Sequence, residues 1–242
     1  MMPTNETTST TGTCTADEAA ARQLMVAYAQ RFAPSGLSQG TSGNLSMRWH
    51  DGEHAGMLIT PSGVDYTRLG PGDLAFMRLD DASWSGPLKP SSEWRFHRDI
   101  YVARPETGAV VHAHPTHATA VAVQRRDIPA FHYMVAVAGG RDIRCAPYAT
   151  YGTEALSQHA LHALADRRAC LLANHGLIAV GADLAAAFAL AQEVEELSRQ
   201  YLLALAVGQP VVLPDDEMDR VLEAFKSYGA NAQKGCALPG HA

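Results

Sequence analysis

The chain has 242 residues, 47% of them hydrophobic and 18% charged, with a formal net charge of −6 and a pI near 6.0. This composition is typical of one globular domain whose core needs no disulfide bonds. The acidic balance and the lack of a basic run argue against a nucleic-acid partner, and the absence of a long uninterrupted apolar segment argues against a membrane span.

The reactive side chains narrow the possible chemistry. The cysteines are far apart and lack C-x-x-C spacing, which predicts free thiols and a cytoplasmic location; they are Cys14, Cys145, Cys170 and Cys236. Lysine is scarce, since only Lys89, Lys226 and Lys234 accompany 16 arginines. A mechanism through a Schiff base on lysine therefore has few candidate nucleophiles.

The pattern along the chain predicts one α/β domain over residues 15–230, between a flexible N-terminal tail at 1–14 and a C-terminal tail at 231–242. Thr15 and Glu18 have the spacing of a capping box, which opens a helix to about Arg31. Further helices are expected at about 93–102, 116–124, 154–165, 184–207 and 215–225. Strands are expected at 56–59, from 109 to before Pro115, and at 169–174.

Three loops rich in glycine, proline and hydroxyl side chains lie at residues 39–46, 60–63 and 89–93. Each alone is typical of a turn. The third precedes a helix, whose free N–H groups favour an anion. Together the loops would suit a phosphate group that is held without lysine.

Histidines follow two apolar strands. His112 and His114 lie two residues apart, so in an extended strand they face the same way and can share a divalent ion. His175 follows the strand at 169–174 and is the third candidate ligand. His97 is more typical of a hydrogen-bonded core histidine, and His117 of a supporting residue.

These motifs, in this order, resemble the class II, zinc-dependent aldolases of the aldolase/adducin superfamily, with the fuculose-phosphate branch closest in pattern. The stretches that carry the resemblance are 39–46, 59–63, 90–97, 110–117, 128–140, 145–153 and 174–178. The resemblance implies a three-layer α-β-α fold whose mixed, largely antiparallel sheet is flanked by helices. It also implies a homotetramer with active sites at subunit interfaces.

The resemblance also implies roles for individual residues. His112, His114 and His175 match the zinc ligands, and Glu93 matches a catalytic carboxylate that also binds the metal when no substrate is present. Tyr133 matches a tyrosine that reaches a neighbouring subunit's site, and Tyr228 a second catalytic tyrosine. The phosphate-binding positions are Gly43, Asn44, Ser62, Gly63, Ser91 and Ser92. Tyr151 stands where the fuculose-phosphate branch has Phe, beside the aldehyde end of the substrate.

The expected activity is metal-dependent cleavage of a ketose 1-phosphate to dihydroxyacetone phosphate and an aldehyde. Fuculose 1-phosphate and related deoxy- or methylthio-pentulose 1-phosphates are the candidate substrates, and manganese or cobalt could replace zinc. The main alternative is a pentulose-5-phosphate 4-epimerase, a branch in which Asp is expected at the position of Glu93. Dehydratases, decarboxylases and a non-catalytic adducin-like binding module are the remaining alternatives.

Overall fold

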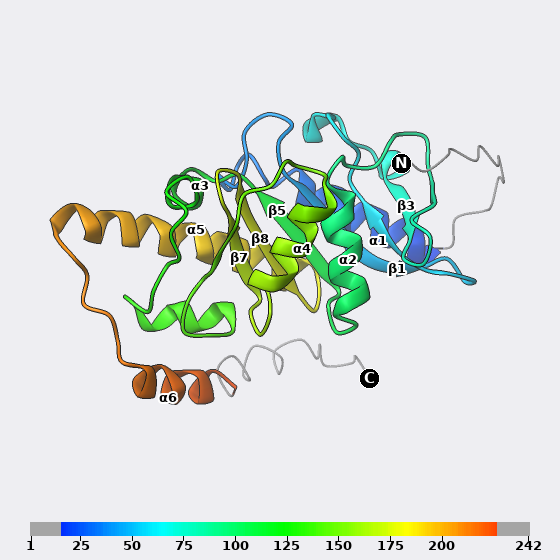
Figure 1. The fold of residues 1–242 in the computed structure, drawn as a ribbon. Coiled ribbons are helices and arrows are strands. Elements are labelled where there is room, and N and C mark those ends of the chain that lie inside the picture. Colours follow the sequence, from blue (N-terminus) through cyan, green and yellow to red (C-terminus); the bar gives the residue numbers. More distant parts are fainter. Residues whose placement is uncertain (1–15, 227–242) are drawn as a thin grey trace, which may run out of the picture.

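The structure is a computed structural model that describes residues 16–226. It has three layers, with helices on both faces of one eight-stranded sheet (Figure 1), as expected. Thr15, Tyr228 and two of the cysteines lie outside the described residues. Cys145 and Cys170 are free thiols, as expected.

The sheet has the strand order β4-β3-β2-β1-β5-β8-β7-β6. All neighbouring pairs are antiparallel except β6 and β7, so the sheet is mixed and largely antiparallel. The strands are β1 (Asn44–His50), β2 (Ala55–Ile59), β3 (Ala75–Arg78), β4 (Trp84–Ser85), β5 (Ala109–Ala113), β6 (Cys145–Ala146), β7 (Ala169–Leu172) and β8 (Gly176–Gly181).

The described residues also form six α-helices and three short 3₁₀ helices. The α-helices are α1 (Ala16–Ala29), α2 (Trp94–Ala103), α3 (Thr116–Ala122), α4 (Glu154–Ala163), α5 (Leu184–Val207) and α6 (Asp215–Phe225). The 3₁₀ helices are η1 (Tyr66–Arg68), η2 (Pro71–Asp73) and η3 (Tyr133–Ala138). Asp183 and Thr153 cap α5 and α4, since their side chains accept hydrogen bonds from Ala186 N and Leu156 N.

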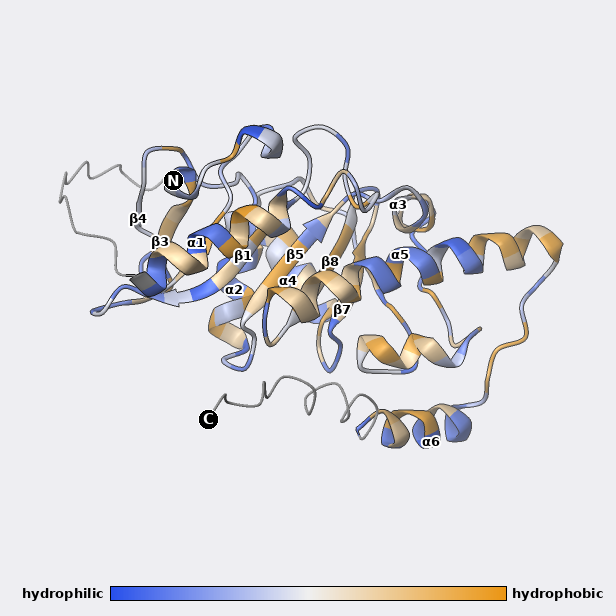
Figure 2. Ribbon diagram, turned by 180° about the vertical axis from the view of Figure 1, so that it is seen from behind, coloured by the Kyte–Doolittle hydropathy of each residue, from blue (hydrophilic) through white to orange (hydrophobic). Residues whose placement is uncertain are grey.

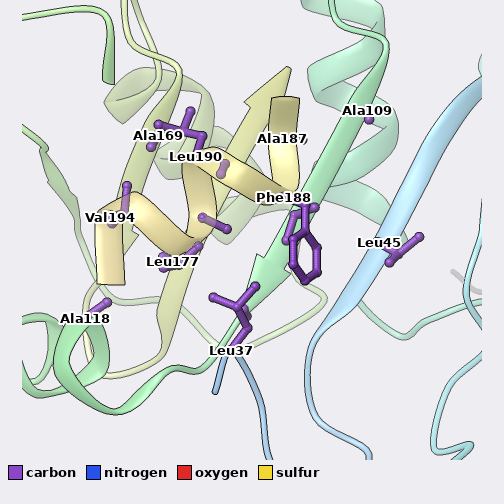
Figure 3. Packing of buried hydrophobic residues seen from close by; sticks show 14 of the residues in the cluster. Leu37, Leu45, Ala109, Ala118, Ala169, Leu177, Ala187, Phe188, Leu190 and Val194 are labelled. Atoms are coloured by element: carbon purple, nitrogen blue, oxygen red, sulfur yellow. The ribbon is translucent and has the colours of Figure 1, made fainter. Parts of the chain in front are cut away.

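Two cores lie on the two faces of the sheet. In Figure 1, α2 and α4 lie in front of the sheet, while α1 and α5 lie behind it. The larger core belongs to the rear face, where the Phe188 ring of α5 makes edge contacts with Tyr28 and Phe32. Figure 3 shows Phe188 and Val194 of α5 on this side of the strands that carry Ala109 and Leu177. Because β5 is covered on both faces, a polar side chain on it is buried.

The main differences from the sequence expectations concern short elements. The first helix ends at Ala29 rather than near Arg31, and Glu93 precedes the first turn of α2 instead of lying in it. Strand β1 begins at Asn44, inside the stretch expected to be a loop. The sequence did not predict β3, β4, β6 or β8.

The far end of α5 is apolar on its outer side. Figure 2 shows this part of α5 coloured hydrophobic where it projects from the body of the molecule. Leu203 and Val207 on this end are exposed, as is Val211 just after it. Among residues 16–226, no helix has the length and apolar character needed to cross a bilayer.

Candidate active site

Three histidines and one carboxylate meet beyond the end of β5. His112 lies on β5, His114 follows that strand, His175 lies in the turn between β7 and β8, and Glu93 precedes α2. One potential ligand atom from each lies within 4.8 Å of those of the others. His112 Nε2 is 2.8 Å from His114 Nε2 and 3.1 Å from Glu93 Oε2. The expectation that His112 and His114 face the same way is confirmed.

The protonation pattern of this cluster fits a cation. His112 Nδ1–H donates to the carbonyl oxygen of Leu177 at 2.8 Å, so its Nε2 carries a lone pair when the ring is neutral. That lone pair faces a carboxylate oxygen and a second imidazole nitrogen, an arrangement that only a proton or a metal ion makes favourable. Burial, together with the nearby histidines, lowers the pKa of His114 to about 3, which keeps this ring in the form that binds metals.

Glu93 is a buried, ionised carboxylate. Burial by itself would raise its pKa, but the neighbouring His112 and His175 hold the pKa of Glu93 below its usual range. Its Oε2 accepts a hydrogen bond from Asn44 Nδ2 at 3.0 Å. Its Oε1 is buried without a hydrogen-bond donor and lies 3.2 Å from His175 Nε2. A buried carboxylate oxygen that has no hydrogen-bond donor and lies beside imidazole nitrogens is available as a metal ligand.

Three of the four candidate ligands, Glu93, His114 and His175, line a cavity of about 370 Å³. Its walls carry the loops expected to bind phosphate and also Tyr151, which is 64% exposed. The lining residues include Gly43, Asn44, Ser62, Gly63, Ser91, Ser92, Glu93, His114 and His175. No lysine or arginine is among the described residues that line it, so hydroxyl and backbone N–H groups are the available anion ligands.

Backbone contacts hold the loops in place. The loops at 60–63 and 89–93 are joined by an antiparallel bridge between Pro61 and Pro90. Gly63 has φ +70°, a left-handed backbone conformation that residues other than Gly rarely adopt. The buried Tyr66 hydroxyl donates to Gly43 O in the first loop at 2.8 Å and lies 3.2 Å from Thr60 Oγ1 in the second, so it links the two loops.

Some site residues were missed by the sequence analysis, and one expected residue lies elsewhere. Thr41, Tyr148 and Asn174 also line the cavity. All three lie inside stretches that carried the family resemblance, 39–46, 145–153 and 174–178, and this was the available signal. Tyr133 starts η3, is 48% exposed and is not among the lining residues. The His117 ring faces Glu195 of α5, at 2.7 Å, in keeping with a supporting role.

Gly176 permits the close approach of β8 to the histidines. A Cβ atom at this position would lie 2.3 Å from Ala113 O and 2.6 Å from a carbon of the His114 ring. We therefore expect Gly176→Ala to weaken metal binding by about tenfold or more, because the substitution displaces a ligand. Equilibrium titration with Co²⁺ would measure this. Gly72→Ala, where a Cβ meets nothing within 4 Å, is the control and should bind as the unaltered chain does.

Comparisons with known proteins agree with this site. Residues 23–202 match the protein family described as Class II Aldolase and Adducin N-terminal domain. The chain belongs to this family. The expectation that it is a lyase of the class II aldolase type is confirmed by relatives that are named aldolases.

Two relatives in this family cover most of the chain. The 5-methylthioribulose-1-phosphate/5-deoxyribulose-1-phosphate aldolase of Rhodospirillum rubrum is 54% identical over 214 residues, which are 88% of this chain and 95% of the relative. The L-fuculose phosphate aldolase of Escherichia coli strain K12 is 50% identical over 200 residues, 82% of this chain and 91% of the relative. A solved structure of an L-fuculose 1-phosphate aldolase superposes with a TM-score of 0.81 at 42% identity, covering 88% of this chain and 97% of that one.

Proposed function

We propose that this protein is a metal-dependent aldolase that cleaves a ketose 1-phosphate to dihydroxyacetone phosphate and an aldehyde. One observation carries the proposal: Glu93, His114 and His175 of the four-residue cluster line the same cavity as the hydroxyl-bearing loops. A sugar phosphate needs both parts at once. Its phosphate would contact Ser62, Ser91 and Ser92, while the carbons to be separated would lie near Glu93.

In cleavage, the hydroxyl group on carbon 4 loses its proton, the bond between carbons 3 and 4 breaks, and its electron pair passes to carbon 3. A bound divalent ion, held by His112, His114 and His175, would supply Lewis-acid stabilisation of the negative charge that develops on the oxygens. Zinc, manganese and cobalt all suit this ligand set. None of the described residues that line the cavity is a lysine that could form the iminium required by the alternative mechanism.

The proton transfers fall to the chain's own residues. Because its carboxylate is ionised and lies at the cavity wall, Glu93 removes the proton from carbon 3 in the condensation direction. In cleavage Glu93 first takes up a proton and then delivers it to carbon 3. In condensation the Tyr133 hydroxyl gives its proton to the aldehyde oxygen, which becomes the oxygen on carbon 4. In cleavage the Tyr133 phenolate takes that proton back, and Tyr228 assists. Tyr151 and Tyr148 line the cavity beside these groups and would contact the aldehyde fragment.

We propose a homotetramer in which Tyr133 acts in the site of a neighbouring subunit. Tyr133 is half exposed and absent from the lining of the cavity in its own chain. The exposed apolar end of α5, with Leu203, Val207 and Val211, supports an interface. Light scattering should give the mass of four chains.

The substrate is tested by a coupled assay for dihydroxyacetone phosphate with added Zn²⁺. The compounds are the 1-phosphates of fuculose, rhamnulose, 5-deoxyribulose and 5-methylthioribulose. Release from one or more supports the proposal, and the ranking of kcat/KM identifies the aldehyde that is preferred. If the metal is bound but none is cleaved, the proposal fails, and a phosphorylated product with an intact carbon chain would favour the epimerase.

The placement of Tyr133 gives a test by complementation. Glu93→Gln and Tyr133→Phe should each be nearly inactive, but a one-to-one mixed tetramer should regain about a quarter of the activity, because some sites then receive both intact residues from different subunits. Co-expression with two affinity tags isolates the mixed assemblies. Activity no higher than that of the parents would contradict a role across the interface.

A further inference from the structure

A line of buried polar side chains runs from the candidate site into the contact between β1 and α2. Glu93 Oε2 is 3.0 Å from Asn44 Nδ2, and Asn44 Oδ1 is 2.5 Å from His97 Nε2. His97 Nδ1 is 2.7 Å from Ser46 Oγ, which is 2.9 Å from the Tyr101 hydroxyl. All five side chains belong to residues that are at least nine-tenths buried.

The periodicities of the two elements produce this line. Asn44 and Ser46 are two residues apart on β1, so both face α2. Glu93, His97 and Tyr101 are spaced four residues apart. His97 and Tyr101 therefore lie on one face of α2, and Glu93, which directly precedes the helix, continues that face. Asn44 also lies opposite His112 in the register of β1 and β5, which brings the end of the line to the histidine cluster.

The line has a defined direction. Asn44 Oδ1 can only accept, so His97 Nε2 must carry the hydrogen and donate it. A neutral His97 then accepts at Nδ1 from the Ser46 hydroxyl, which accepts in turn from Tyr101. Burial, with a further contribution from His112, lowers the pKa of His97 to about 3, so the ring is neutral as this pattern requires.

We propose that His97 is a positioning residue, which through Asn44 sets the orientation of the Glu93 carboxylate. The donation from His97 Nε2 fixes which end of the Asn44 amide faces Glu93. With the amide reversed, Asn44 Oδ1 would oppose Glu93 Oε2, two acceptors with no hydrogen between them. In the observed orientation Oε2 is bonded to Asn44, while Oε1 keeps no hydrogen-bond donor and faces His175.

As a result, the two oxygens of the Glu93 carboxylate have different surroundings. The inference rests on the proposed function, because Glu93 is there the group that moves the proton. Losing the donor at His97 should leave the Asn44 amide free to reverse and Glu93 free to turn. A merely structural histidine would instead affect the thermal midpoint without changing kcat.

The test compares His97→Leu, which removes the donor, with His97→Gln, whose amide can donate to Asn44 and accept from Ser46. The matched control is Ser157→Ala, which breaks a partly buried hydrogen bond between α4 and α2, from Ser157 to Asp99 at 2.7 Å; neither residue lines the cavity. We expect His97→Leu to lower kcat by about 10- to 100-fold at little changed KM, and His97→Gln to restore most of it. Ser157→Ala should match the unaltered chain in kcat.

A second measurement does not depend on turnover. Visible absorption of the Co²⁺-loaded protein reports how the ligands are arranged around the ion. We expect the spectrum to change in His97→Leu and to be close to the original in His97→Gln and Ser157→Ala, with thermal midpoints recorded for all of them. If the unaltered chain cleaves no ketose phosphate, the proposed function fails, and this spectrum still decides the inference about His97.

The inference would be overturned if His97→Leu keeps the original spectrum and, in an active protein, the original kcat. It would also be overturned if the change falls on KM alone, because Asn44 would then be acting on the phosphate rather than on Glu93. An equal loss of kcat in His97→Gln and His97→Leu would contradict the role of the Nε2 donor.

Discussion

Glu93→Gln should lower kcat by about 10²- to 10⁴-fold while the protein still binds its metal ion. The substitution keeps the shape and one oxygen of a buried side chain, but it removes the basic oxygen that, in the proposed function, exchanges a proton with carbon 3. The three histidines remain, so metal content should stay close to one ion per chain. Steady-state kinetics combined with metal analysis measures both quantities.

Isotope exchange separates the role of Glu93 from that of Tyr133. In D₂O without an aldehyde, the unaltered chain should exchange one hydrogen of dihydroxyacetone phosphate for deuterium, which NMR detects. Glu93→Gln should lose this exchange, whereas Tyr133→Phe should retain it, because no aldehyde oxygen takes part in that half of the reaction. Asp99→Asn, farther along α2 and outside the cavity lining, should behave as the unaltered chain. Normal exchange by Glu93→Gln would disprove its role as the base.

The long elements were predictable from sequence because their signals are strong. The α5 helix at Leu184–Val207 and the α6 helix at Asp215–Phe225 lie where periodicity placed them. Strand β8 was missed because the expected strand was ended at residue 174, and the apolar stretch that follows within three residues of β7 was assigned no element. Asn174 in that turn has φ +55°, and Asn is among the residues that accept this conformation. The Asn-His-Gly sequence there was the available sign of a hairpin.

The candidate ligands were predictable for a different reason. The alternation of side chains along extended backbone places His112, on β5, and His114, just after it, on one side whatever the rest of the fold does. That Glu93 meets them depends on where α2 packs, and no local pattern encodes this. The contact of Glu93 with His112 therefore came from the family resemblance and is visible only in three dimensions.

The residues that lie behind the site were also only partly predictable from the sequence. The spacing indicates that His97 lies on the same side of α2 as Glu93. The prediction that His97 is a buried, hydrogen-bonded histidine is confirmed. What spacing could not reveal is that Asn44 stands between them. Asn44 was expected to bind phosphate, yet its amide is bonded to Glu93 and His97, with one N–H left over for a ligand. Its role toward phosphate stays a prediction.

Removing the metal ion should abolish cleavage and isotope exchange together, because the charge that develops on the oxygens would then have no cation to stabilise it. After dialysis against a chelator, added Zn²⁺, Co²⁺ or Mn²⁺ should restore activity to different degrees.

His175→Ala should weaken metal binding strongly, because it takes away one imidazole and leaves Glu93 Oε1 beside an empty position. Ion binding to the folded state alone raises the thermal midpoint, so added Zn²⁺ should stabilise the unaltered chain far more than His175→Ala. His162→Ala, on α4 and outside the cavity lining, is the matched control. Full activity in chelated, metal-free protein would refute the proposed chemistry, whereas a metal-free protein that loses exchange as completely as cleavage would place the ion at the step where carbon 3 becomes negative.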